Sequence, residues 1–295
     1  MAEGRAYGGQ TMAGRLARVL LCTPEAAGWR DPLRVKDWRE LGYLEIPDAN
    51  LARAQHDALR GHLQDAAVEV LELPAAPDLS LDAVYAHDAS FVTDEGVVLM
   101  KMGKAARQSE PARQAALFAA VGIPILGAIE APGTAEAGDL VWLDTDTLLA
   151  GQGYRTNEAG IAQLRALLRP QGIDVIAAPL PYGAGPGACL HLMSLMSVLD
   201  ERTLLVDLPW LAVQTVELLK ERGFALIGID ESERETLACN VLALGAGRVV
   251  AIAENVATNR RLAAQGFDVR GYPGSAISRN GSGGPTCLTR PLLRL

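Results

Sequence analysis

The feature that most constrains the fold of this chain is an order of secondary structure that returns about every 50 residues. Four times the pattern of apolar residues predicts a strand, a turn, a second strand, a helix and a third strand. A half-unit without a helix ends the chain at 283–293, and a strand at 18–23 with a helix at 50–67 can complete it. Five such units predict a closed ring of repeats. The other helices are expected at 108–120, 157–169, 210–222 and 256–265.

A polar residue stands just before or inside the first strand of each unit. The separations between successive members are 51, 52, 49 and 47 residues, and the members are Asp88, Asp139, His191, Asn240 and Cys287. Equivalent positions in a closed ring point toward one axis, so these side chains are predicted to meet in a polar central site. Coincidence among polar residues at strand starts is the alternative, and the repeated order of elements argues against it.

Composition narrows the functional classes. The 295 residues are 49% hydrophobic, the net charge is −8 and the pI is near 5.1, which argues against a nucleic-acid partner. No apolar run is long enough to span a membrane. Residues 1–16 are Gly-rich and lack a signal sequence, so we expect a flexible tail there and a single domain over 17–295. The four cysteines have no CxxC or zinc-ligand spacing, which favours reduced thiols and a cytoplasmic location.

Cys287 follows a glycine-rich stretch, "NGSGGPT", instead of lying in an apolar run. A thiol is a nucleophile as its thiolate, which a histidine or a cationic substrate favours. Cys287 and His191 are therefore a candidate nucleophile and general acid/base. The alternative is a small packing residue, which is how we interpret Cys22, Cys189 and Cys239 beside apolar strands.

The acidic members indicate what the site binds. Asp88 lies in an otherwise apolar strand, and Glu136 and Asp139 precede a strand among small residues. Buried carboxylates need a cation, and a guanidinium fits because paired hydrogen bonds leave its central carbon exposed. A helix cap or a solvated turn is the alternative for Glu136 and Asp139.

Two arginines stand at equivalent places in successive units. Arg107 and Arg155 are candidates to hold a substrate carboxylate. The alternative is a surface ion pair or a charge near a helix N-terminus, where a cation is electrostatically unfavourable. The segment 30–50 is a candidate substrate cover or an ordinary surface connection.

Four stretches in order, "FVTDEGVVLMKMGKAARQSEP", "AEAGDLVWLDTDTLLAGQGYRTNEAG", "LHLMS" and "GGPTCLTRPL", resemble the guanidino-group modifying enzymes. These include dimethylarginine dimethylaminohydrolase, arginine deiminase and the amidinotransferases, and the resemblance runs from about residue 18 to 294. It implies the pentein fold, a five-bladed α/β propeller. It also implies roles for the matching residues: nucleophile Cys287, general acid/base His191, acidic partner Glu136, guanidinium ligand Asp88, carboxylate ligands Arg107 and Arg155, and loop-ordering Asp139.

One departure bears on the substrate. Arginine deiminases and amidinotransferases have H-x-D where this chain has "HLM", with Met193 in place of the aspartate, and dimethylarginine hydrolases usually have a lysine there. The resemblance thus implies hydrolysis of an N-methylated arginine to citrulline and an amine, through a covalent thiouronium on Cys287, with no metal or organic cofactor. The expected partner is a small guanidino amino acid, and a homodimer is possible.

Three alternatives stay open at this stage: arginine deiminase or citrulline hydrolase activity, amidino transfer to an acceptor amine, and a non-enzymatic role. Another pentein family binds the large ribosomal subunit. The acidic pI and the presence of Cys287, His191 and Glu136 argue against that role.

Overall fold

Five three-stranded sheets form the molecule, and the computed structural model describes residues 5–188 and 190–295. In each sheet the first strand pairs antiparallel with the second, and the second pairs parallel with the third. A parallel pair needs a long crossover, and each one here contains a helix. This is the strand and helix order that the sequence predicts.

Four sheets follow one another along the chain. Their strands are β3 (Ser90–Thr93), β4 (Gly96–Leu99) and β5 (Ile125–Ala128); β6 (Leu140–Trp142), β7 (Thr147–Gln152) and β8 (Asp174–Pro179); β9 (Met196–Val198), β10 (Thr203–Val206) and β11 (Ala225–Gly228); and β12 (Leu242–Gly245), β13 (Arg248–Ile252) and β14 (Asp268–Tyr272). Their crossover helices are α3 (Glu110–Ala120), α4 (Glu158–Leu168), α5 (Val213–Glu221) and α6 (Val256–Ala264).

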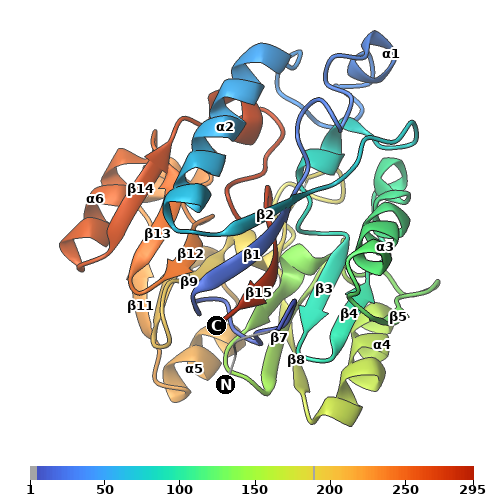
Figure 1. Ribbon diagram of the computed structural model, residues 1–295. Coiled ribbons are helices and arrows are strands. Elements are labelled where there is room, and N and C mark those ends of the chain that lie inside the picture. Colours follow the sequence, from blue (N-terminus) through green and yellow to red (C-terminus); the bar gives the residue numbers. More distant parts are fainter. Residues whose placement is uncertain (1–4, 189) are drawn as a thin grey trace.

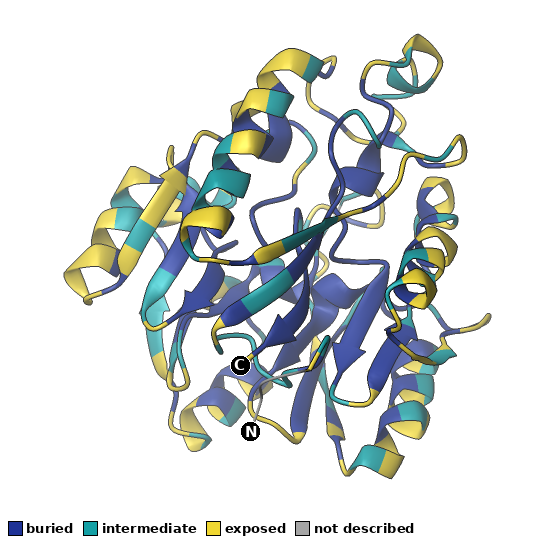
Figure 2. Ribbon diagram, in the orientation of Figure 1, coloured by how far each residue is buried: buried dark blue, intermediate teal, exposed yellow. Residues whose placement is uncertain are grey.

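The fifth sheet joins the two ends of the chain and closes the ring. β15 (Arg290–Arg294) pairs antiparallel with β1 (Leu16–Leu21), which pairs parallel with β2 (Glu69–Glu72) across α2 (Ala49–Asp65). The prediction that the N-terminal strand and helix complete the last half-unit is therefore confirmed. The helices lie at the periphery with exposed outer faces, and the strands inside them are mostly buried (Figures 1 and 2).

Helix α4 illustrates how local sequence places an element. Asn157 caps it by accepting a hydrogen bond from the Gly160 backbone nitrogen at 2.8 Å. Ile161, Leu164 and Leu168 recur at helical spacing and are fully buried in one apolar cluster with β7 and β8. Each such side chain contributes roughly 1.5–3 kcal/mol relative to exposure. For α2, the cap is Asp48 and not Asn50: its carboxylate accepts from the nitrogens of Asn50 and Leu51.

The N-terminal segment differs from the expected flexible tail. Residues 1–4 lie outside the described residues, but the segment that follows is held against the C-terminal strand. The Gly8 nitrogen donates to the Leu292 carbonyl at 2.8 Å, and the Arg294 nitrogen donates to the Gly8 carbonyl at 2.9 Å. These bonds fix residues that composition alone suggests are loose.

Helix α1 (Pro32–Val35) belongs to the long connection that the sequence marks as a candidate substrate cover. Figure 1 shows it projecting from one end of the molecule. The connection is anchored at its far end, where the nitrogens of Leu44 and Glu45 donate to the main chain and side chain of Asn280. Within the described part of the chain, no helix combines the length and the apolar character needed to cross a membrane.

Candidate active site

The five equivalent polar residues link each repeat to another around the centre. Asp88 accepts from the backbone nitrogen of Gly138 at 3.1 Å, and Asp139 accepts from that of Leu192 at 2.9 Å. Asn240 accepts from the nitrogen of Thr286 at 3.0 Å. The last repeat joins the first where the Cys287 carbonyl accepts a hydrogen bond from the backbone nitrogen of His87 at 3.1 Å. The spacing of the repeats thus correctly predicts a polar centre.

A cavity of about 420 Å³ opens at this centre, and Asp88, His191, Asn240 and Cys287 all line it. Asp139 does not. The connection between β1 and α2 reaches the cavity at residues 40–42, which supports its interpretation as part of the wall over the site. Asp88 lies in the turn before β3, and not inside a strand as its apolar surroundings suggest.

Cys287 lies three residues before the start of β15 and is partly exposed to the cavity. The Asn240 side-chain nitrogen donates to its sulfur at 3.1 Å. The glycines before it allow close packing: a Cβ at Gly283 would lie 2.3 Å from the Tyr85 ring, and one at Gly284 would lie 2.5 Å from the Asn240 amide carbon. The glycine-rich stretch therefore brings the chain against Tyr85 and Asn240, which sets the cysteine beside its hydrogen-bond donor.

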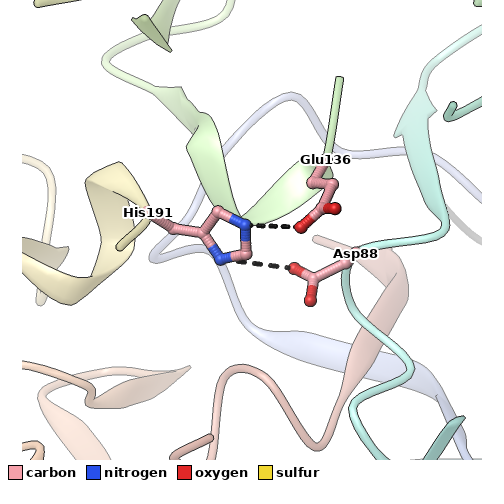
Figure 3. A group of neighbouring side chains, drawn as sticks. All are labelled: Asp88, Glu136 and His191. Carbon is pink, nitrogen blue, oxygen red and sulfur yellow. Dashed lines mark hydrogen bonds and ion pairs between the residues drawn. The ribbon is translucent and has the colours of Figure 1, made fainter. Parts of the chain in front are cut away.

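His191 is held between two acids from other repeats, as Figure 3 shows. Its Nε2 lies 2.7 Å from Glu136 Oε2, and its Nδ1 lies 3.9 Å from Asp88 Oδ1. Because a carboxylate only accepts, Nε2 carries a hydrogen and donates to Glu136. Gly138 makes this approach possible, since a Cβ there would lie 2.5 Å from Nδ1.

Glu136 is fully buried and does not line the cavity. Its oxygens accept from the Gly103 nitrogen at 2.8 Å, from Arg155 at 3.1 Å at both oxygens, and from His191. Burial acts to raise the pKa of Glu136, but the hydrogen bond and charge of His191 and the charge of Arg155 hold it well below its usual value. Glu136 is thus an ionised acid that orients the histidine.

Asp88 is ionised as well. Burial acts to raise its pKa, but the charges of His191 and Arg107 lower it. Arg107 is buried and donates to Asp88 Oδ2 at 2.7 Å, to both oxygens of Glu110 and to the Tyr85 carbonyl. Arg107 therefore holds Asp88 in place; it also lines the cavity, so its contact with a substrate carboxylate stays a prediction.

Of the remaining residues that the sequence predicts for the site, one lines the cavity and the other is buried outside it. Arg155 lines the cavity and pairs with Glu136. Asp139 is buried, with Thr156 and the Leu192 nitrogen as its partners, so it orders the loop of His191. Burial raises the pKa of Asp139 to about 6. Cys22 and Cys239 are buried and unbonded to other cysteines, as expected for packing residues, and Cys189 lies outside the described residues.

Sequence reasoning missed two ion pairs in the cavity wall. Lys104 pairs with the buried Asp82 and also donates to the Leu41 carbonyl at 2.6 Å. Arg234 pairs with the buried Asp207. Lys104 and Asp207 follow Asp88 and His191 by 16 residues each, the same separation as that of Arg155 from Asp139, so the repeat spacing holds a signal for these two residues.

The donor set also permits a metal ion. Asp88, Glu136 and His191 each offer a ligand atom within 4.8 Å of the others. Two arginines and a histidine hydrogen already occupy these carboxylates, however, and the cysteine lies in the same cavity. The arrangement is better suited to a flat organic cation above a thiol than to a metal ion.

Comparison with known proteins identifies the family. The family model for arginine deiminase matches residues 76–216 and 208–294. The chain belongs to the arginine deiminase family. It is 28% identical to the uncharacterized protein YkgA of Bacillus subtilis over 97% of this chain and 94% of that protein. It is also 28% identical to the dimethylarginine dimethylaminohydrolase of Pseudomonas aeruginosa, over 88% of this chain and 96% of that protein.

Solved structures of the family confirm the pentein fold. A cysteine-to-serine variant of the Pseudomonas aeruginosa dimethylarginine dimethylaminohydrolase, complexed with citrulline, superposes with a TM-score of 0.74 at 25% identity over 94% of this chain and 99% of that one. The N-terminal domain of ArgZ, an arginine dihydrolase of cyanobacteria, superposes with a TM-score of 0.78 at 22% identity, over 94% of this chain and 97% of that one. The protein is therefore an enzyme of the pentein guanidino-hydrolase kind.

Proposed function

We propose that this enzyme hydrolyses the C–N bond of an N-methylated arginine, with Cys287 as nucleophile, and releases citrulline and methylamine or dimethylamine. The observation that carries the proposal is one cavity that brings together a cysteine sulfur with an amide donor, a histidine between two acids, and an ionised aspartate. A guanidinium bound there has a nucleophile, a proton carrier and a counter-charge within one space.

Asp88 is the proposed guanidinium ligand. Each of its oxygens accepts one hydrogen bond from the protein, from Gly138 or from Arg107. A carboxylate oxygen has two acceptor positions, so Asp88 retains capacity for a pair of guanidinium N–H groups. Glu136 has no such capacity, because its four acceptor positions already serve Gly103, Arg155 and His191. Its proposed role is to orient His191.

His191 is the proposed proton carrier, and the atom concerned is Nδ1. Since Nε2 donates to Glu136, Nδ1 is the nitrogen whose proton is exchanged with the reaction. The negative charge of Glu136 stabilises the imidazolium form, as an oriented carboxylate does for other catalytic histidines. Nδ1 also faces Asp88, the residue that holds the reacting group.

The reaction proceeds in two steps. The Cys287 sulfur bonds to the guanidinium carbon, the bond from carbon to the methylated nitrogen breaks, and His191 delivers a proton to the departing amine. A water molecule then gives a proton to His191 and adds to the same carbon. The C–S bond breaks and citrulline leaves. The bound cation and the Asn240 amide both favour the thiolate, by charge and by hydrogen bonding.

Met193 supports a substrate with an alkylated nitrogen. It is buried, lines the cavity and occupies the place of the second aspartate of the H-x-D motif. A thioether offers apolar contact and no charge, so a methyl group is accommodated where an N–H would lack an acceptor. Arg155 is the preferred ligand of the substrate carboxylate, because Arg107 and Arg155 both line the cavity but the Arg155 side chain is 11% exposed and that of Arg107 is 4% exposed.

The test is a substrate panel. Asymmetric dimethylarginine, monomethylarginine, arginine and citrulline are incubated with the wild type and with Cys287→Ala, and the amine and ureido products are measured by mass spectrometry. Release of a methylated amine that the variant abolishes supports the proposal. Turnover of arginine or citrulline alone refutes the methylarginine substrate, and turnover only with an added acceptor amine refutes hydrolysis in favour of amidino transfer.

A second variant tests the role of Met193. Met193→Asp restores the missing carboxylate, so the ratio of kcat/KM for arginine to that for dimethylarginine is expected to rise at least tenfold. One hydrogen-bonded charge of about 1.5–3 kcal/mol accounts for this change. An unchanged ratio would show that the side chain at position 193 does not discriminate between alkylated and unalkylated guanidino nitrogens.

A further inference from the structure

Two buried arginines on β15 have no role in the proposed chemistry. Arg290 and Arg294 are each 5% exposed. They are four residues apart in β15, and both side chains line the same small cavity. This strand pairs with β1 and closes the ring, which puts both guanidinium groups in the interior where the first and last repeats meet.

Every hydrogen-bond partner of these arginines is neutral. Arg290 donates to the carbonyls of His87 and Ser90 and to the His87 ring. Because His87 Nδ1 donates to the Thr289 carbonyl, its Nε2 accepts from Arg290 and the ring carries no charge. In agreement, burial and the charge of Arg290 lower the pKa of His87 to about 3. Arg294 donates to the carbonyls of Gly14 and Ala243.

Neither arginine has a carboxylate partner within residues 5–188 and 190–295. The Arg290 Nε is buried and has no hydrogen-bond acceptor in that part of the chain. Asp88 acts on Arg290 only through space, since its oxygens are bonded to Gly138 and Arg107. Burial lowers the pKa of Arg294 to about 9. Two buried guanidinium charges without a counter-ion are costly, which calls for an anion from outside the chain.

Both side chains line one small cavity. It has a volume of about 20 Å³, and both arginines line it, together with Phe91, Trp142 and the N-terminal residues 8, 9, 11 and 12. That is room for one particle the size of a water molecule or a small ion. Thr11 Oγ1 accepts from the nitrogens of Ala13 and Gly14, so its hydroxyl hydrogen is available as a further donor at the cavity wall.

We propose that this cavity binds a single small monovalent anion, chloride, between Arg290 and Arg294. The two guanidinium groups supply the charge and most of the hydrogen-bond donors, and aromatic rings complete the wall. The N-terminal segment covers the site, which gives residues 8–12 a function beyond pairing with β15. His87 lines the active-site cavity and its ring accepts from Arg290, so one side chain separates Arg290 from the substrate site.

The first experiment measures thermal unfolding of the whole protein in sodium chloride and in sodium gluconate at equal ionic strength. Binding to the folded state stabilises it by mass action, so the melting temperature is expected to rise by about 2–5 °C more in chloride across a hundredfold range of concentration. Arg294→Met removes one guanidinium and is expected to abolish the difference. Arg270→Met, at an exposed arginine of β14, is the matched control and retains it.

The second experiment needs no variant. Crystals of the wild type are soaked in sodium bromide, and anomalous diffraction locates bound bromide. A peak between Arg290 and Arg294 supports the proposal. Equal melting temperatures in the two salts, or bromide peaks only at other places, would overturn it. Neither readout uses enzymatic turnover, so the outcome is independent of the proposed substrate.

Discussion

Replacing Gly138 with alanine tests the arrangement of the site most directly. The new Cβ would lie 2.5 Å from His191 Nδ1 and 2.8 Å from Asp88 Oδ1, whereas ordinary contacts begin near 3.4 Å. Both side chains must therefore move, His191 by up to about 1 Å and Asp88 by less. A displacement of that size at a reacting group costs about 10²-fold in rate, or about 3 kcal/mol of transition-state stabilisation. Overpacking is expected to cost a further 1–3 kcal/mol of the free energy of unfolding, roughly.

The assay is steady-state amine release, with unfolding in urea measured on the same samples. We expect kcat to fall about 10²-fold while KM changes less, because the substitution does not touch Arg155, the proposed ligand of the substrate carboxylate. Gly187→Ala is the matched control: Gly187 lines the same cavity and a Cβ there meets nothing within 4 Å, so its kinetics should stay within twofold of wild type. A folded Gly138→Ala variant with wild-type kcat would refute the view that His191 and Asp88 act in the positions described.

Three further predictions follow from single contacts. Asn240→Ala removes the hydrogen bond to the Cys287 sulfur. We expect kcat/KM to fall about 10–100-fold and the acidic limb of the pH–rate profile to move to higher pH. An unchanged profile would argue that the amide does not support the thiolate. Burial raises the pKa of Asp139 to about 6, so its ionisation opposes folding as the pH rises from about 4 through 6. Over that interval, the free energy of unfolding of Asp139→Asn in urea should rise relative to that of the wild type by up to about 3 kcal/mol. A difference that stays constant with pH would contradict this. Dialysis against EDTA should leave turnover unchanged, whereas a loss that zinc or another divalent ion restores would make the cluster of one histidine and two acids a metal site.

Local sequence signals locate the elements well but place their ends less well. Helix α4 is predicted at 157–169 and observed at Glu158–Leu168, because an asparagine cap and a clean apolar stripe coincide there. The apolar residues before Ser90 suggest a strand, yet Leu81–Val84 form a short 3-10 helix and β3 begins at Ser90. Those residues are buried in either form, so burial alone does not distinguish the two.

Repeat spacing predicts which residues meet but not what each one does there. Asp88, His191, Asn240 and Cys287 meet because equivalent positions of a closed ring share an axis, and that is a property of the period alone. The pairing of Arg107 with Asp88 and Glu110 is a contact that the order of residues in the chain does not contain, and the contact of Arg107 with a substrate carboxylate stays a prediction.

The sequence by itself determined the repeat, the number of sheets and four of the residues that line the polar centre, because apolar periodicity and spacing are local or periodic quantities that can be read along the chain. Only the tertiary structure decided which acid orients His191, which acid keeps acceptors for a guanidinium, and that the N-terminal segment packs over two buried arginines. These depend on distances between residues from different repeats, and ångström differences in such distances decide hydrogen bonds and charge pairing.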